Sequence, residues 1–211
     1  MKRYIALCIA VSIVGCTDKK KAVITPEKEI VSDTVKTVIP ENKIDPTLLI
    51  VPGESIGLTS LGQSAATLAK LGRADLSDAA MGKAWMSWYS KKADTDGFKS
   101  ELMIKTSYKD SSMNEKVIKE IRINSADFKT KEGNGKGQDL AKLKLAFPDL
   151  KVVAKYKNTI TKAVVQVYDD TNNGIGFEIQ QDGKCIAVIV HPKQQSTISE
   201  YLVLHDELVR L

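Results

Sequence analysis

GQSAATLAKLG, residues 62–72, decides the fold together with its counterpart GQDLAKLKLAFPD, residues 137–149. Each stretch begins with Gly-Gln and a small polar residue, and each continues with apolar residues at helical spacing. Gly72 is suited to end the first helix, and Pro148 cannot continue the second. The two stretches lie 75 residues apart, and self-similarity at a fixed period indicates an internal repeat.

Apolar runs with strand character follow each predicted helix. The stretch EIRIN, residues 120–124, alternates apolar and polar side chains with period two, as a half-buried strand does. Gln-Asp-Gly at residues 181–183 predicts a hairpin turn. The expected strands are residues 84–89, 98–108, 117–128, 151–157, 163–168, 174–180 and 184–191. We also expect a second short helix at residues 77–82, capped by Ser77, and a strand or short helix at residues 198–211.

These elements together predict an α+β fold. Two tandem units, residues 48–132 and residues 133–211, each contain a helix followed by an antiparallel sheet, and they pack into one domain. The second unit opens with the glycine-rich residues 133–137. Their spacing fits neither a phosphate-binding loop nor a dinucleotide-binding fingerprint, so we interpret them as a connector between the units.

The amino terminus has the features of a bacterial secretory signal. The chain begins Met-Lys-Arg, and the apolar residues 4–14 that follow are too few to span a bilayer, which takes about 20 apolar residues. The signal ends Ile-Val-Gly-Cys at residues 13–16, which resembles the lipobox of bacterial lipoproteins. This resemblance implies that residues 1–15 are removed and that Cys16 is acylated, for example with palmitate. The alternative is an ordinary secretory signal in which Cys16 is incidental.

Residues 16–47 are expected to comprise the lipidated cysteine and a flexible tether. Their prolines and scattered apolar residues show no sustained period, and such a segment cannot bury enough apolar surface to offset its chain entropy. Thr17, rather than Asp, follows the cysteine, which resembles the pattern of lipoproteins sorted to the outer membrane. We therefore predict an outer-membrane lipoprotein whose domain faces the periplasm or the cell surface.

Composition argues against a nucleic-acid-binding protein and against a domain stabilised by disulfides. The formal net charge is +5, and loss of Lys2 and Arg3 with the signal leaves +3, without the clustered basic residues of a nucleic-acid surface. Of the cysteines, Cys8 leaves with the signal and Cys16 is lipidated, so Cys185 is left as a single thiol. One thiol cannot form an internal disulfide, and core packing must stabilise the domain.

Residues capable of chemistry are few and scattered. His191 and His205 are the two histidines, and neither has a second His or a Cys at metal-ligand spacing. Cys185 lies in an apolar stretch that indicates a buried side chain rather than a nucleophile. The run DDTNNG, residues 169–174, looks like the start of a calcium loop but has Gln180 at the twelfth position, so a hairpin turn is the preferred interpretation. We expect no catalytic residue, no metal and no cofactor.

Trp85, Trp88 and Tyr89 are the candidate protein-binding residues. Residues three apart in a strand point to opposite faces, so one tryptophan is expected to face the core and the other to face outward. Exposed aromatic side chains mark binding surfaces. The alternative is that the helix and the carboxyl-terminal segment cover all of them.

The order of a glycine turn, a short helix and several antiparallel strands resembles two known families. Residues 62–75 and 137–149 carry the resemblance, which is to the repeat of β-lactamase inhibitory protein and to the unit of the BamE (SmpA/OmlA-type) outer-membrane lipoproteins. It implies a protein-binding sheet without chemistry. We therefore expect a non-enzymatic lipoprotein that contacts the bilayer through Cys16 and binds another envelope protein. The alternatives are an envelope lipoprotein that binds a small ligand or polysaccharide and, third, an enzyme.

Overall fold

The computed structural model describes residues 45–94, 96–199, 205 and 207–211. The chain divides into two units, Met1–Glu41 and Asn42–Leu211, and every described residue belongs to the second unit. The signal peptide, Cys16 and nearly all of the expected tether lie outside the described residues. The described part begins with Asp45, whose carboxylate accepts a hydrogen bond from the backbone N–H of Thr47 and caps the 3-10 helix η1 (Pro46–Leu48).

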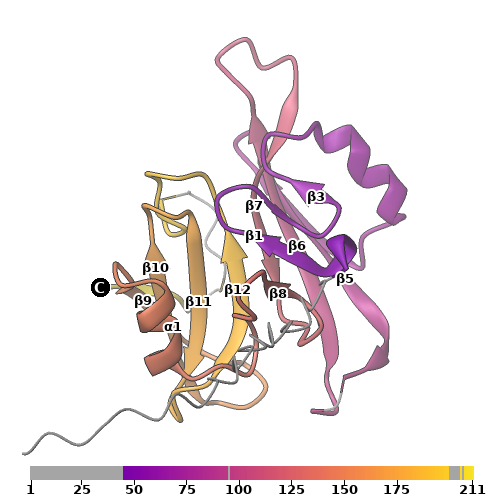
Figure 1. Ribbon diagram of the computed structural model, residues 1–211. Coiled ribbons are helices and arrows are strands. Elements are labelled where there is room, and N and C mark those ends of the chain that lie inside the picture. The colour runs from indigo at the N-terminus through magenta and orange to yellow at the C-terminus, as the bar shows by residue number, and fades with distance from the viewer. Residues whose placement is uncertain (1–44, 95, 200–204, 206) are drawn as a thin grey trace, which may run out of the picture. The chain divides into compact units, whose positions relative to one another are not determined.

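A nine-stranded antiparallel sheet forms the body of the second unit (Figure 1). Its strand order is β13-β9-β10-β11-β12-β7-β6-β5-β4. The strands are β4 (Leu76–Ala80), β5 (Lys83–Ala93), β6 (Lys99–Tyr108), β7 (Lys116–Ile123), β9 (Lys151–Lys157), β10 (Val164–Asp170), β11 (Ile175–Gln180), β12 (Cys185–Val190) and β13 (Val209–Arg210). Because neighbouring strands are antiparallel throughout, consecutive strands are joined mostly by short turns.

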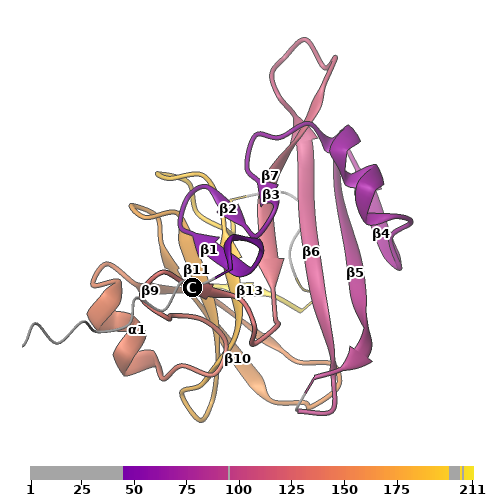
Figure 2. The same ribbon diagram turned by 45° about the vertical axis from the view of Figure 1, so that its right-hand side comes forward.

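A second, small sheet and two helical segments lie against one face of the large sheet (Figure 2). The small sheet has the order β3-β2-β1-β8, in which only β1 and β8 are parallel. Its strands are β1 (Leu49–Val51), β2 (Ser55–Ile56), β3 (Thr59–Ser60) and β8 (Lys129–Thr130), and the helical segments are η2 (Ala65–Leu71) and α1 (Leu140–Ala146). We call the face that they cover the first face.

The large sheet buries side chains on both of its faces. The main core lies on the first face, where Phe177 packs against Phe147 with 5.3 Å between ring centroids. A smaller cluster of Ala154, Tyr156, Val165, Val167 and Ile189 lies on the opposite, second face, with Ile198 and Leu208 of the carboxyl-terminal segment packed against it. Strands buried on both sides have few positions for polar side chains that face water, so polar groups on the second face need partners within the protein.

The prediction of an α+β fold made of two helix–sheet repeats is wrong. Strands account for 46% of the described residues and helices for 11%, so the fold is mostly β. β7 and β12 pair directly, with Ile121 opposite Val190, and this pairing makes one continuous sheet of strands assigned to separate units. The two longer helical segments span seven residues each, and one of them is a 3-10 helix. Helices this short are not stable on their own, and the strands decide the class.

The local predictions fare better than the fold class. Strands are confirmed at all seven expected places, and β9 has the expected bounds. Gly72 ends η2 with a positive φ of 77°, as predicted. The helix expected at residues 77–82 is wrong, because Ser77 pairs with Met86 in a β-hairpin. Residues 133–137 form turns between β8 and α1, but they do not connect two units, because the strands on either side belong to one sheet.

Candidate functional site

The three aromatic residues predicted to bind a partner lie on different faces of β5. Trp88 lies on the first face, where it packs against the main core and its indole N–H donates to the carbonyl oxygen of Gly72 at 3.2 Å. Trp85 and Tyr89 lie on the second face, opposite Lys105 and Glu101 of β6. The prediction that the two tryptophans point to opposite faces is confirmed. Trp88 packs against the main core, so Trp85 is the tryptophan left for a partner on the second face.

Trp85 and Tyr89 belong to a partly exposed strip at one end of the sheet. Leu76 of β4 pairs with Ser87, which lies between them on the second face, and Leu76 is half exposed. Tyr89 is 38% exposed, so part of its side chain is open to a partner. We call Leu76, Trp85 and Tyr89 the edge strip. β4 is the terminal strand of the sheet, and its other backbone edge has no neighbouring strand among the described residues.

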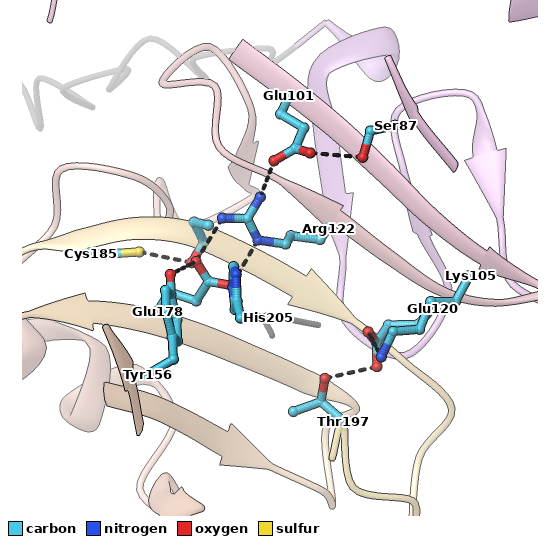
Figure 3. Close-up of polar contacts among 11 residues, drawn as sticks. Ser87, Glu101, Lys105, Glu120, Arg122, Tyr156, Glu178, Cys185, Thr197 and His205 are labelled. Carbon is cyan, nitrogen blue, oxygen red and sulfur yellow. Dashed lines mark hydrogen bonds and ion pairs between the residues drawn. The ribbon is translucent and has the colours of Figure 1, made fainter. Parts of the chain in front are cut away.

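Further along the second face, a buried arginine links three strands (Figure 3). Arg122 of β7 donates to both carboxylate oxygens of Glu178 on β11, each at 2.7 Å, in a bidentate pair. Its remaining terminal nitrogen donates to Glu101 of β6 at 2.8 Å, and Glu101 in turn accepts from the hydroxyl of Ser87. Glu178 is fully buried, and the small side chain of Ala187 on β12 faces it in the register. The pair spans β12 because this small residue leaves room above the strand.

His205 of the carboxyl-terminal segment also contacts this network. His205 lies 3.0 Å from Glu178 through its Nε2 atom, and its ring stacks on Tyr156 with 3.5 Å between ring centroids. The hydroxyl of Tyr156 donates to Glu178 at 2.8 Å. Each carboxylate oxygen of Glu178 therefore has two polar partners, which is the condition under which a buried charge is tolerated.

Burial and charge act in opposite directions on this network. Burial alone would raise the pKa of Glu178, but Arg122 and then His205 outweigh it and hold that pKa far below its usual range. Burial likewise disfavours the charged form of Arg122, yet Glu178 and Glu101 keep its pKa above the usual value. Burial, followed by the charge of Glu178, raises the pKa of Tyr156. These directions favour the charged forms of Glu178 and Arg122 and the neutral form of Tyr156, the forms that make the hydrogen bonds and ion pairs of the network.

A second polar cluster fixes residues 196–197 on the same face. Glu120 forms a salt bridge with Lys105 at 2.8 Å and accepts from the hydroxyl of Thr197 at 2.7 Å. Asp169 accepts from the Ser196 hydroxyl and from the backbone N–H of Thr197, and it lies 2.7 Å from Nε2 of His191. Burial would lower the pKa of His191, but the contact with Asp169 outweighs it and raises that pKa. Both clusters therefore hold the carboxyl-terminal segment to the sheet.

The other residues considered for chemistry have structural surroundings. Cys185 is a buried core residue, as predicted, and burial raises the pKa of its thiol to about 12, which disfavours the nucleophilic thiolate. The run at residues 169–174 is a hairpin turn between β10 and β11, in which the Asp170 carboxylate accepts from the backbone N–H groups of Asn172 and Asn173. Among the described residues, no group of three or more His, Cys, Asp or Glu side chains is arranged to hold a metal ion.

Sequence reasoning missed the buried charged network, although the sequence carries a signal for it. Glu120 and Arg122 alternate with isoleucines in β7, and Glu178 is flanked by apolar residues on both sides in β11. Charged residues in strands that are otherwise apolar indicate buried pairs.

Within the described part of the chain, no helix is long and apolar enough to cross a membrane. Comparison with known proteins found no match among protein-family models, curated proteins or solved structures.

Proposed function

We propose that this chain is a lipid-anchored, non-catalytic protein of the bacterial cell envelope that binds another envelope protein. The lipobox-like residues 13–16 support the anchor. The buried charged groups of the second face support a non-catalytic domain, because they form ion pairs and hydrogen bonds with one another. The binding role rests on one observation, the partly exposed edge strip beside the outer edge of β4, which pairs with no strand among the described residues.

The edge strip has the chemistry of a protein-binding surface. Tyr and Trp contribute large contact areas at low cost in side-chain entropy and are enriched at the centres of interfaces. Beside them, β4 offers backbone N–H and C=O groups to an added strand, a recurring mode of peptide recognition. Asp78 on β4 lies opposite Trp85 and discourages unselective strand pairing.

The anchor is tested by metabolic labelling of growing bacteria with a clickable fatty acid. We expect the natural chain to be labelled and the Cys16→Ser chain to be unlabelled, because the thiol of Cys16 is the acceptor for the diacylglyceryl group. The label is read by in-gel fluorescence after equal amounts of protein are loaded. Equal labelling of the two chains, or no labelling of either, would contradict the anchor.

The binding surface is tested by photocrosslinking in intact cells. A photoreactive phenylalanine analogue at position 89 is expected to give one discrete protein adduct, because Tyr89 lies in the edge strip. The same analogue at position 98 is the matched control, since Phe98 is exposed outside the strip. Trp85→Ala should reduce the adduct from position 89 by about 30-fold, the loss of an interface residue worth roughly 2 kcal/mol.

Immunoblotting of the crosslinked cells distinguishes the outcomes of this experiment. Adducts of equal yield from positions 89 and 98 would indicate nonspecific capture and would contradict the proposed surface. An adduct whose yield is unchanged by Trp85→Ala would exclude that tryptophan from the interface. Circular dichroism of the purified Trp85→Ala protein establishes that the fold is retained.

A further inference from the structure

We propose that the hairpin formed by β9 and β10 is a second membrane contact that binds anionic phospholipid headgroups. The contact surface comprises three lysines and three apolar side chains, which we call the basic hairpin. Its members are Lys155, Lys157, Ile160, Lys162, Val164 and Val209. This inference rests on the proposed function, because a lipid anchor at Cys16 is what would hold the hairpin near a bilayer.

The charge of the basic hairpin is positive. Lys155, Lys157 and Lys162 are exposed, and none of them forms a salt bridge with a described residue. Lys151 of the same strand lies on the other face, where it pairs with Asp169, and is not part of this surface. The surface therefore presents the positive charges of three lysines to a partner, and an exposed ammonium group attracts anionic headgroups.

Strand register places exposed apolar side chains directly beside these lysines. Val164 of β10 pairs with Lys157, and Val209 of β13 pairs with Lys155, so each valine shares a face with its lysine. Both valines are exposed. Lysines beside aliphatic side chains suit the boundary between headgroups and acyl chains, because the aliphatic groups enter the apolar layer and the ammonium groups stay at the phosphates.

The turn of the hairpin holds one further apolar side chain outward. Ile160 is 72% exposed at the tip. The carboxamide oxygen of Asn158 accepts from the backbone N–H groups of Ile160 and Thr161, each at 2.9 Å, and the backbone N–H of Lys162 donates to the carbonyl of Asn158. This turn is ordered without a ligand, so little conformational entropy is lost when Ile160 enters a membrane.

The composition favours a lipid surface over the other anionic partners. Nucleic-acid surfaces use exposed stacking aromatics, whereas both aromatic residues of the hairpin, Tyr156 and Tyr168, are buried. The edge strip differs in charge, since Asp78 and Glu101 lie beside its aromatic residues. The two surfaces are therefore suited to different partners, one to a lipid headgroup layer and one to a protein.

Vesicle sedimentation tests the inference with residues 42–211, which lack Cys16. This unit contains both core clusters, so we expect it to fold on its own, which circular dichroism establishes beforehand. The natural sequence is expected to sediment with vesicles of phosphatidylcholine and phosphatidylglycerol but not with pure phosphatidylcholine. Added salt should weaken binding, because it screens the lysines.

Two matched double variants locate the contact. Lys155→Glu with Lys157→Glu should reduce the vesicle partition coefficient at least about 25-fold, since each lysine near an anionic surface contributes roughly fivefold. Lys91→Glu with Lys92→Glu makes the same change of charge at two exposed lysines of β5. These two lie outside the basic hairpin, and we expect a change below about threefold from the altered net charge alone.

Each remaining outcome overturns the proposed contact. A natural sequence that fails to sediment with anionic vesicles, or that sediments equally with neutral ones, excludes selective headgroup binding. Equal losses of vesicle binding from the two double variants would show that binding depends only on the net charge of the protein. Because this protein lacks Cys16, a negative vesicle result leaves the fatty-acid labelling of the full chain unaffected, and failure of that labelling leaves the vesicle result unaffected.

Discussion

Arg122→Met lowers the free energy of unfolding by about 3–5 kcal/mol, the effect of removing one partner from a buried ion pair. The methionine retains the apolar stem but leaves Glu178 with neither of its two 2.7 Å bonds from the guanidinium. Glu178 is fully buried and cannot regain hydration without opening the sheet. Urea denaturation followed by circular dichroism measures the change.

A double variant distinguishes an unpaired charge from lost packing. Arg122→Met combined with Glu178→Gln removes both charges, so we expect it to recover at least half of the stability lost by Arg122→Met alone. A double variant that is as unstable as the single variant would show that the charge of Glu178 is not the cause. Lys184→Met is a second control, because its salt bridge with Asp139 is half exposed and such pairs contribute less than about 1 kcal/mol.

Gly174→Ala is expected to destabilise the domain by about 2–5 kcal/mol, through a left-handed backbone and a steric clash together. Gly174 has a φ of 71° in the turn between β10 and β11. An added Cβ would lie 2.7 Å from the Cα of Gly53 and would also overlap the carbonyl oxygen of His191, both of which are backbone atoms that cannot rotate away. The loss is measured as a shift of the urea midpoint at constant slope.

Gly183→Ala is the matched control for this substitution. Gly183 also lies in a hairpin turn and has a φ of 82°, but an added Cβ there meets no atom within 4 Å. Gly183→Ala should therefore lower the free energy of unfolding only by the cost of a left-handed backbone at alanine, about 1–2 kcal/mol. Equal losses at the two positions would contradict the close approach of the β10–β11 turn to the segment around Gly53.

Local patterns in the sequence predict the strands but not how they combine. Period-two alternation in EIRIN requires only neighbouring residues, and β7 forms there as expected. The class depends on the pairing of Ile121 with Val190, which no local pattern encodes. The stretch at residues 77–82 was misleading because Ser77 resembles a helix cap, whereas Met81 and Gly82 adopt successive positive φ values, which is the geometry of a tight hairpin turn.

For the candidate sites too, the sequence predicts local features but not contacts between distant residues. The opposite faces of Trp85 and Trp88 follow from their spacing in a strand, and the shared face of Trp85 and Tyr89 follows from theirs. The pair of Arg122 and Glu178 joins residues 56 apart in sequence. It exists because β12 lies between β7 and β11 in the sheet, and that order results from the competition of all strands for partners. Sequence patterning alone therefore could not pair them.

The closure of the second face by Thr197 and His205 determines when this domain can finish folding. Both residues belong to the final fifteen of the chain, and both contact carboxylates in the interior of the sheet. A nascent chain that has not yet released these residues from the ribosome leaves Glu120 and Glu178 in contact with water. The native state is therefore reached only after Thr197 and His205 have been added to the chain and have joined the sheet.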